Sequence, residues 1–112
     1  MDTKFELIVA IVNRGFSDNV MDAAKAAGAR GGTILHARGT GIHEEAKFFG
    51  ISIQPEKDMV MILVKQPDRD AIMHAISVGA GLNTEGRGLT FSLPVTDVAG
   101  IVHMMDKEKQ EP

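Results

Sequence analysis

The chain repeats one pattern, a strand followed by a helix and a second strand, and this repeat limits the folds open to it. A shift of 52 positions aligns identical residues in the two halves, namely Val12 with Val64, Asp18 with Asp70, Met21 with Met73 and Ala23 with Ala75. Two copies of such a unit predict a βαββαβ order, the split pattern of ferredoxin-like sandwiches. We therefore expect an α+β fold in which two helices cover one face of an antiparallel sheet.

Apolar runs and turn residues place the individual elements. Strands are expected at about 5–12, 32–37, 59–64 and 89–95, with a short fifth strand at about 98–104. Ser17 is the expected N-cap of the first helix, and Gly28 is its expected C-terminal stop. Asp68 and Gly79 are expected to begin and end the second helix in the same way.

The stretch that joins the second and third strands follows no single period. Residues 43–50 are expected to form a short helix ended by Gly50, and residues 51–53 an extended arm. We therefore predict one domain over residues 1–105 with a flexible loop at about 40–56. The charged tail, residues 106–112, is expected to be disordered.

The strands are apolar on both faces, which predicts that the sheet is covered on both sides. The runs 7–12 and 59–64 contain no charged or polar residue. A sheet face that meets water normally alternates apolar with polar residues. Aromatic residues are only 4% of the chain, so the aliphatic core gains from association. A closed ring of identical chains would bury the second face.

Composition and charge exclude several classes of protein. A net charge of −3 argues against a nucleic-acid partner, which would require a basic patch. The absence of cysteine removes disulfides and thiolate metal sites. The sequence has no apolar run near the ~20 residues that cross a bilayer, and its first residues lack a secretory pattern. We expect a cytoplasmic protein without direct membrane insertion.

Two short glycine turns are the strongest indication of a binding site. They are Arg38-Gly39-Thr40-Gly41, after the second strand, and Glu85-Gly86-Arg87-Gly88, before the fourth. Glycine allows positive φ and close approach of the backbone, and successive N–H groups in such a turn bind anions. The alternative is that both are ordinary tight turns at strand ends. An arginine in each turn favours a site for a phosphate-sized anion.

The order of elements, the stretch from Gly32-Thr33 to Gly41 and the Gly86-Arg87-Gly88 turn resemble the P-II nitrogen-regulatory signal-transduction family. The resemblance runs from about residue 5 to 104. It implies a homotrimer of ferredoxin-like subunits that binds adenine nucleotides between subunits. It also implies a regulatory protein rather than an enzyme, whose flexible loop controls a partner protein such as a membrane transporter.

The resemblance also suggests which residues bind the nucleotide, and it shows departures from the family pattern. The residues carried over are Thr33, Gly39, Gly41, Leu63, Gly86 and Gly88, to which Arg38 and Arg87 add charge. Leu89 stands where the family has a phosphate-binding lysine, while His103 and Met105 fall roughly where it has two arginines. Loss of these charges predicts weaker triphosphate binding, which leaves AMP, ADP, ATP or cyclic AMP as candidate ligands.

The loop carries the residues expected to meet a protein partner, His43, Phe48, Phe49 and Ser52. Adjacent aromatic residues in a short connection are typical of an interface, although both could pack on the trimer body. His43 replaces the glutamine with which the family helps to bind 2-oxoglutarate beside magnesium, which argues against 2-oxoglutarate sensing. No metal is expected, because the sequence has no HExxH pattern and adjacent residues of a helix point away from one another. One alternative is a trimeric divalent-metal protein of the CutA type that binds through His43. Another is a small enzyme with a histidine base.

Overall fold

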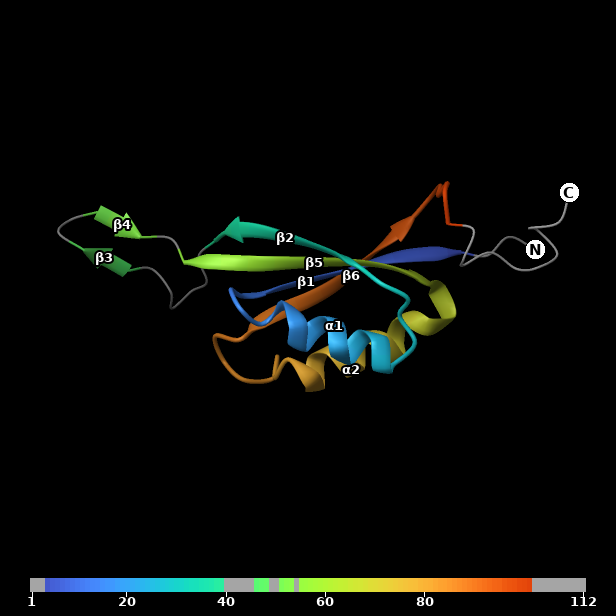
Figure 1. The fold of residues 1–112 in the computed structure, drawn as a ribbon, viewed down its shortest axis with the longest axis horizontal. Coiled ribbons are helices and arrows are strands. Elements are labelled where there is room, and N and C mark those ends of the chain that lie inside the picture. The colour runs from blue at the N-terminus through green and yellow to red at the C-terminus, as the bar shows by residue number, and fades with distance from the viewer. Residues whose placement is uncertain (1–3, 40–45, 49–50, 54, 102–112) are drawn as a thin grey trace, which may run out of the picture.

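A computed structural model describes residues 4–39, 46–48, 51–53 and 55–101 of the chain. Its centre is an antiparallel sheet in the order β2-β5-β1-β6, made of β2 (Thr33–Arg38), β5 (Glu56–Lys65), β1 (Phe5–Asn13) and β6 (Gly88–Val95). Helices α1 (Ser17–Ala26) and α2 (Arg69–Gly79) lie together on one face of this sheet (Figure 1). The expected ferredoxin-like α+β sandwich is therefore confirmed.

The register of the two central strands explains the core. Residue Ile8 of β1 lies opposite Ile62 of β5, and Ala10 lies opposite Val60. These side chains point toward the helices, because alternate residues of a strand share one face. They pack with Val20, Met21 and Ala24 of α1 and with Ile72 and Ile76 of α2. Of the residues paired by the repeat, Val12 and Val64 both lie in this core, and Met73 packs against the core that contains Met21.

The first helix begins one residue away from the sequence expectation. Phe16 is its N-cap and Ser17 its first helical residue, so the predicted capping role of Ser17 is wrong. At the other end the expected stop is confirmed, since Gly28 has a φ of +112° and its N–H donates to the Lys25 carbonyl. This left-handed conformation suits glycine, and it turns the chain toward β2.

The second helix follows a short 3-10 turn, η1 (Gln66–Asp68). Asp68 occupies the N-cap position as expected, but its side chain makes no capping hydrogen bond. The helix includes Gly79, and Ala80 is its C-cap, so Gly79 does not stop it. A Cβ on Gly79 would lie 2.6 Å from the Cβ of Ala23. Gly79 therefore serves the close packing of α2 on α1.

The connection between β2 and β5 contains a hairpin where a helix was expected. Strands β3 (Ala46–Phe48) and β4 (Ile51–Ile53) pair in antiparallel fashion, with Lys47 opposite Ser52. The helix prediction is therefore wrong for 46–48, and the extended arm at 51–53 is confirmed. Figure 1 shows this hairpin beyond the end of the main sheet, away from the helices. Residues 43–45 and Gly50 lie outside the described residues.

The chain after β6 forms no regular element as far as it is described. Residues 98–101 are not in a strand, so the expected fifth strand is absent there, and 102–112 lie outside the described residues. Among the helices of the described ranges, neither has the length and apolar character needed to cross a membrane.

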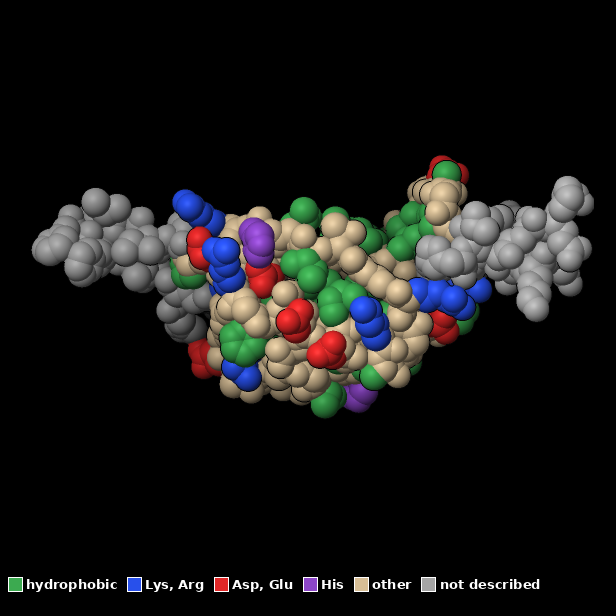
Figure 2. All heavy atoms as spheres, in the orientation of Figure 1, with side chains coloured by type: hydrophobic (Ala, Val, Ile, Leu, Met, Phe, Trp, Pro, Cys, Tyr) green, Lys and Arg blue, Asp and Glu red, His purple; other side chains and the backbone are tan. Residues whose placement is uncertain are grey.

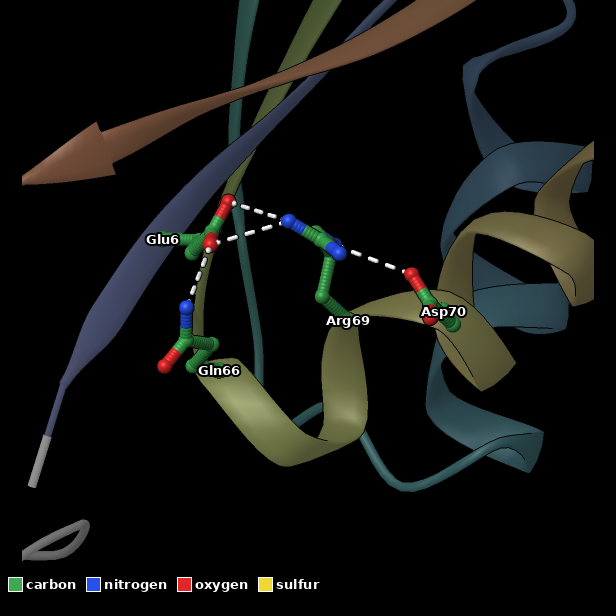
Figure 3. A network of polar contacts seen from close by, with 4 residues as sticks. All are labelled: Glu6, Gln66, Arg69 and Asp70. Atoms are coloured by element: carbon green, nitrogen blue, oxygen red, sulfur yellow. Dashed lines mark hydrogen bonds and ion pairs between the residues drawn. The ribbon is translucent and has the colours of Figure 1, made fainter.

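A buried ion pair joins β1 to the start of α2 (Figure 3). Glu6 is 5% exposed and accepts two hydrogen bonds of 3.0 Å from Nη1 of Arg69. Nε of Arg69 also contacts Asp70 at 3.0 Å, and Nε2 of Gln66 reaches Glu6 at 3.4 Å. Hydrogen bonding to Glu6, followed by that to Asp70, raises the pKa of Arg69. The carboxylate is thus compensated where the sheet meets the second helix.

The face of the sheet opposite the helices is apolar and partly exposed. Leu89, Phe91 and Leu93 of β6 lie opposite Ile11, Val9 and Leu7 of β1 on this face. Their exposed fractions are 53%, 39% and 47%. An exposed apolar sheet surface of this kind is typical of a protein interaction site.

Candidate functional site

Four strand ends meet at the end of the sheet from which the hairpin projects. Arg38 ends β2 opposite Glu56 of β5, and Gly88 opens β6 opposite Val12, near the end of β1. Both predicted glycine turns therefore lie at the same end of the sheet. Arg38 and Gly88 lie at the ends of the two outer strands, which are separated by three strand spacings, or roughly 14 Å. A single chain does not bring them around one small ligand.

The turn before β6 has the backbone geometry that was expected. Gly86 and Gly88 have φ angles of +81° and +135°. A Cβ on Gly88 would lie 2.3 Å from the carbonyl oxygen of Ile11, so β6 can begin here only with glycine. Around Gly86 nothing lies within 4 Å of such a Cβ. The turn is thus anchored at Gly88 and open at Gly86.

A short chain of hydrogen bonds ties this turn to the central strands. Nδ2 of Asn13 donates to the Gly86 carbonyl at 2.9 Å, and Nζ of Lys57 donates to Oδ1 of Asn13 at 2.7 Å. Lys57 is 7% exposed, and its ammonium group brings a positive charge to the sheet beside the turn. Lys57 lies outside both predicted glycine turns, and the sequence analysis did not identify it as a site residue.

The arginine of the same turn is held against the protein. The guanidinium carbon of Arg87 lies 5.0 Å from the centre of the Phe16 ring, a cation–π distance. Its nitrogens also fill the space beside Gly81, where a Cβ would meet them at 3.5 Å. Arg87 therefore packs beside Phe16, at the start of α1.

The turn after β2 is only partly described, since Thr40 and Gly41 lie outside the described residues. The N–H of Gly39 donates to the Pro55 carbonyl at 3.2 Å, so it closes the two legs of the connection. Its φ is not among the positive values of the described glycines. Arg38 is exposed. It lines a depression of about 400 Å³ together with Arg14, His36, Ala37 and Glu56.

Thr33 and Leu63, the remaining predicted nucleotide contacts, lie together but far from the turns. Thr33 opens β2 at the end opposite Arg38, and Leu63 is half-buried on the apolar face of β5. Both line a hollow of about 390 Å³ whose other lining residues are Leu7, Arg30, Gly31, Gly32, Met61 and Ile101. This hollow is large enough for the aromatic part of a small ligand.

A histidine and a buried aspartate, which the sequence analysis did not connect, meet at the edge of the sheet. His36 lies opposite Asp58 in the register of β2 on β5, and Nδ1 of His36 lies 2.9 Å from Oδ1 of Asp58. Burial disfavours the charged carboxylate, but hydrogen bonds from the Gly15 N–H, His36 and Ser17 outweigh it and lower the pKa of Asp58. His36 and Asp58 are 22 positions apart in the sequence, so no local sequence pattern indicates that they meet.

The loop residues predicted to meet a partner are only partly described. Phe48 belongs to β3 and Ser52 to β4, whereas His43 and Phe49 lie outside the described residues. Leu89, which stands in place of a phosphate-binding lysine, lies exposed on the apolar face, while His103 and Met105 are not described. Within the described ranges, no three histidine or acidic side chains gather as metal ligands would.

Comparison with known proteins gives one family. The sequence model of the nitrogen regulatory protein P-II family matches residues 5–103. Among solved structures, the chain is similar to Arabidopsis thaliana PII bound to citrate, with 31% sequence identity and a TM-score of 0.72. The alignment covers 98% of this chain and 94% of the plant protein. No curated protein matches the chain.

Proposed function

The chain belongs to the nitrogen regulatory protein P-II family, and we propose that it signals by binding a small anion, an adenine nucleotide, between subunits. The observation that carries this proposal is the turn at Gly86–Gly88, which is held by Asn13 and Lys57 beside an open backbone. No backbone group of the described residues engages the N–H of Gly86. An anion at this point would accept a hydrogen bond from the Gly86 N–H, close to the positive charge of Lys57.

The distance between the two glycine turns supports an assembly of subunits. One turn follows β2 and the other precedes β6, the opposite outer strand, at the same end of the sheet, so a neighbouring copy must supply the second turn. The apolar face of β1 and β6 gives such a neighbour a surface on which to pack. We therefore propose a homotrimer in which Arg38 and Gly39 of one copy approach Gly86 of the next. This regulatory protein would have no catalytic activity.

The charge at the site favours ligands with fewer phosphates than ATP. Leu89 contributes an apolar side chain where the family pattern has a lysine, and Arg87 is engaged with Phe16. A charge-assisted hydrogen bond contributes roughly 1.5–3 kcal/mol, so each lost contact lowers triphosphate affinity about tenfold or more. AMP, ADP and cyclic AMP are the ligands that this proposal ranks above ATP. Citrate, which the plant PII binds, is a second anion to test.

The hairpin of β3 and β4 is the proposed contact with the regulated protein, a partner that we expect to be a membrane transporter. It extends beyond the sheet end at which the glycine turns lie (Figure 1). The N–H of Gly39, beside the turn, holds the returning leg at Pro55. A ligand that moves this end of β2 would therefore also move the base of the hairpin, which couples binding to partner contact.

Calorimetry with AMP, ADP, ATP, cyclic AMP and citrate tests the proposal. At least one of the four nucleotides should bind the wild-type chain, and Gly86→Ala should weaken it about tenfold or more, since a methyl group would enter the anion turn. Gly28→Ala is the matched control, because Gly28 also has positive φ and open space but lies at the end of α1. Absence of binding by all four nucleotides would refute the nucleotide proposal, as would equal loss in both variants.

A further inference from the structure

The guanidinium group of Arg87 packs against an aromatic ring and a glycine. Its carbon atom lies 5.0 Å from the centre of the Phe16 ring. Its Nε and Nη2 atoms would be in van der Waals contact, at 3.5 Å, with a Cβ at Gly81. Gly81 has a φ of +67°, which glycine adopts without a steric cost. These two residues therefore form a slot that fits a flat cation.

The backbone of the β6 turn is held independently of this slot. Nδ2 of Asn13 donates to the Gly86 carbonyl at 2.9 Å, and the N–H of Phe16 donates to the Asn13 carbonyl at 3.1 Å. The N–H of Arg87 donates to the Thr84 carbonyl at 3.3 Å. Both polar groups of the peptide that joins Gly86 to Arg87 are thus engaged. The Arg87 side chain can therefore leave the slot without a change in the turn.

The contact between Arg87 and Phe16 is weaker than a contact between an arginine and an anion. Arg87 is exposed, and Phe16 is partly buried against the core. The surface at the hairpin end of the molecule carries hydrophobic, basic and acidic side chains close together (Figure 2). An exposed cation–π contact changes an equilibrium by only about two- to fivefold. A charge-assisted hydrogen bond to a phosphate is stronger, so an anion within reach would draw the guanidinium from the ring.

We propose that Phe16 determines ligand specificity by holding the guanidinium of Arg87, which leaves the ring only when the bound anion carries more than one phosphate group. This inference rests on the proposed function, because the anion that it concerns is the one at Gly86. Arg87 directly follows Gly86 in the chain, so its long side chain can turn toward that anion. A single phosphate group is met by the Gly86 N–H and the nearby ammonium of Lys57. A second phosphate group is the one to which Arg87 moves.

The contact therefore lowers affinity only for ligands that need Arg87. ADP and ATP must break it, whereas AMP and cyclic AMP bind while it stays in place. Phe16 thus reduces the affinity for the polyphosphates by the cost of the cation–π contact, about two- to fivefold. Binding of a polyphosphate also frees the Phe16 ring at the start of α1, which provides a signal outside the turn itself.

Calorimetry with Phe16→Leu and Phe16→Trp tests the inference in opposite directions. Leucine is apolar but has no aromatic face, so ATP should bind about two- to fivefold more tightly, with AMP unchanged. Tryptophan is the strongest cation–π partner, so ATP should bind more weakly than to the wild type. The gain in Phe16→Leu should vanish when Arg87→Gln is added, because no guanidinium remains to be released. Phe5→Leu, the same change at the opposite end of β1, should leave the ratio of ATP to AMP affinity unchanged.

Fluorescence gives a second measurement that does not require a nucleotide. The chain has no tryptophan or tyrosine, so the indole of Phe16→Trp is a single reporter of the contact with Arg87. Inorganic pyrophosphate and ATP should both change its emission, and Arg87→Gln in the same background should abolish the change. Arg87→Gln alone, which leaves the aromatic ring in place, should lower the affinity for ATP more than that for AMP. Urea unfolding shows independently that each variant is folded.

A gain in Phe16→Leu that persists with Arg87→Gln would overturn the inference, and so would equal gains for ATP and AMP. It would also fail if neither pyrophosphate nor ATP changed the emission, because Arg87 would then stay on the ring. A pyrophosphate response in a chain that binds no nucleotide would refute the proposed function and leave the role of Phe16 standing. Nucleotide binding with an unchanged ratio of ATP to AMP affinity in Phe16→Leu would have the opposite meaning.

Discussion

Replacing Gly88 with alanine should destabilise the fold far more than the same change at Gly86, two residues earlier in the same turn. Gly88 opens β6 with a φ of +135°, and a Cβ there would lie 2.3 Å from the Ile11 carbonyl oxygen and 3.1 Å from Cα of Val12. Both contacts are to the backbone of β1. That strand pairs with β5 and β6 on its two sides, so it cannot retreat alone.

The expected magnitude combines strain and displacement. A non-glycine residue in this φ region costs about 1–3 kcal/mol. The contact with the Ile11 carbonyl must also open by about 0.7 Å to reach the 3.0 Å below which real Cβ contacts essentially never occur. Such a shift breaks at least one ladder hydrogen bond, a further ~1 kcal/mol. Gly86→Ala meets no atom within 4 Å, so it costs only the left-handed strain of about 1–2 kcal/mol.

Urea unfolding at one fixed protein concentration measures the difference between Gly88→Ala and Gly86→Ala. We expect Gly88→Ala to lose about 3 kcal/mol and to exceed the loss in Gly86→Ala by about 1.5 kcal/mol. Gly28→Ala, with φ of +112° and open space, should resemble Gly86→Ala. Equal losses at Gly86 and Gly88 would refute the reasoning, because they would show that the approach of β6 to β1 carries no cost.

Three further changes test other contacts. The pKa of Asp58 is lower in the fold than in the unfolded chain, so its contribution to stability is present above about pH 4 and is lost on acidification. Asp58→Asn should therefore make the stability depend less on pH during acid unfolding, followed by circular dichroism, and an unchanged profile would contradict this. Arg69→Met should lower the urea midpoint, because it leaves the carboxylate of Glu6 buried without its arginine. Adding Glu6→Leu should recover part of this loss. If the effects of the two changes on the free energy of unfolding simply add, the ion pair does not contribute as argued. Leu93→Glu should give a single subunit by light scattering, whereas a wild-type mass of one chain would exclude the homotrimer.

The repeat in the sequence predicted the architecture well because it reflects packing on both sides of one core. Ile8 and Ile62 face the helices from paired strands, and Val20 of α1 and Ile72 of α2 belong to the same core. Such positions must be apolar at the spacing of their element, so periodicity detects them. The limits of β1, β2 and β6 agree with the expected ones to within one residue, whereas β5 begins at Glu56, three residues before the expected start at 59.

The prediction failed where tertiary contacts rather than local pattern decide the outcome. Ser17 has the chemistry of an N-cap, yet its hydroxyl is engaged with Asp58 and Phe16 takes the capping position. Residues 46–48 have helix-forming composition, but they pair with β4 as a hairpin. Short elements gain too little from propensity to resist such pairing.

The contacts of the candidate site were hidden for a different reason, namely that they depend on strand register. His36 meets Asp58 only because Thr33 lies opposite Met61, which fixes every later pair of β2 with β5. A slip of one residue would turn the imidazole to the other face of the sheet. Lys57 reaches Asn13 through the register of β5 on β1 in the same way. Sequence spacing does not encode either contact.

These register contacts divide the end of the sheet into two parts with different electrostatic character. Lys57, Asn13 and Gly86 link the β6 turn to β5 through the ammonium group of a buried lysine. Asp58 links His36 of β2 to the Gly15 N–H through a buried carboxylate, whose pKa these hydrogen bonds lower. A buried anion repels a second one, so the β6 turn is the part of this end that favours an anionic ligand.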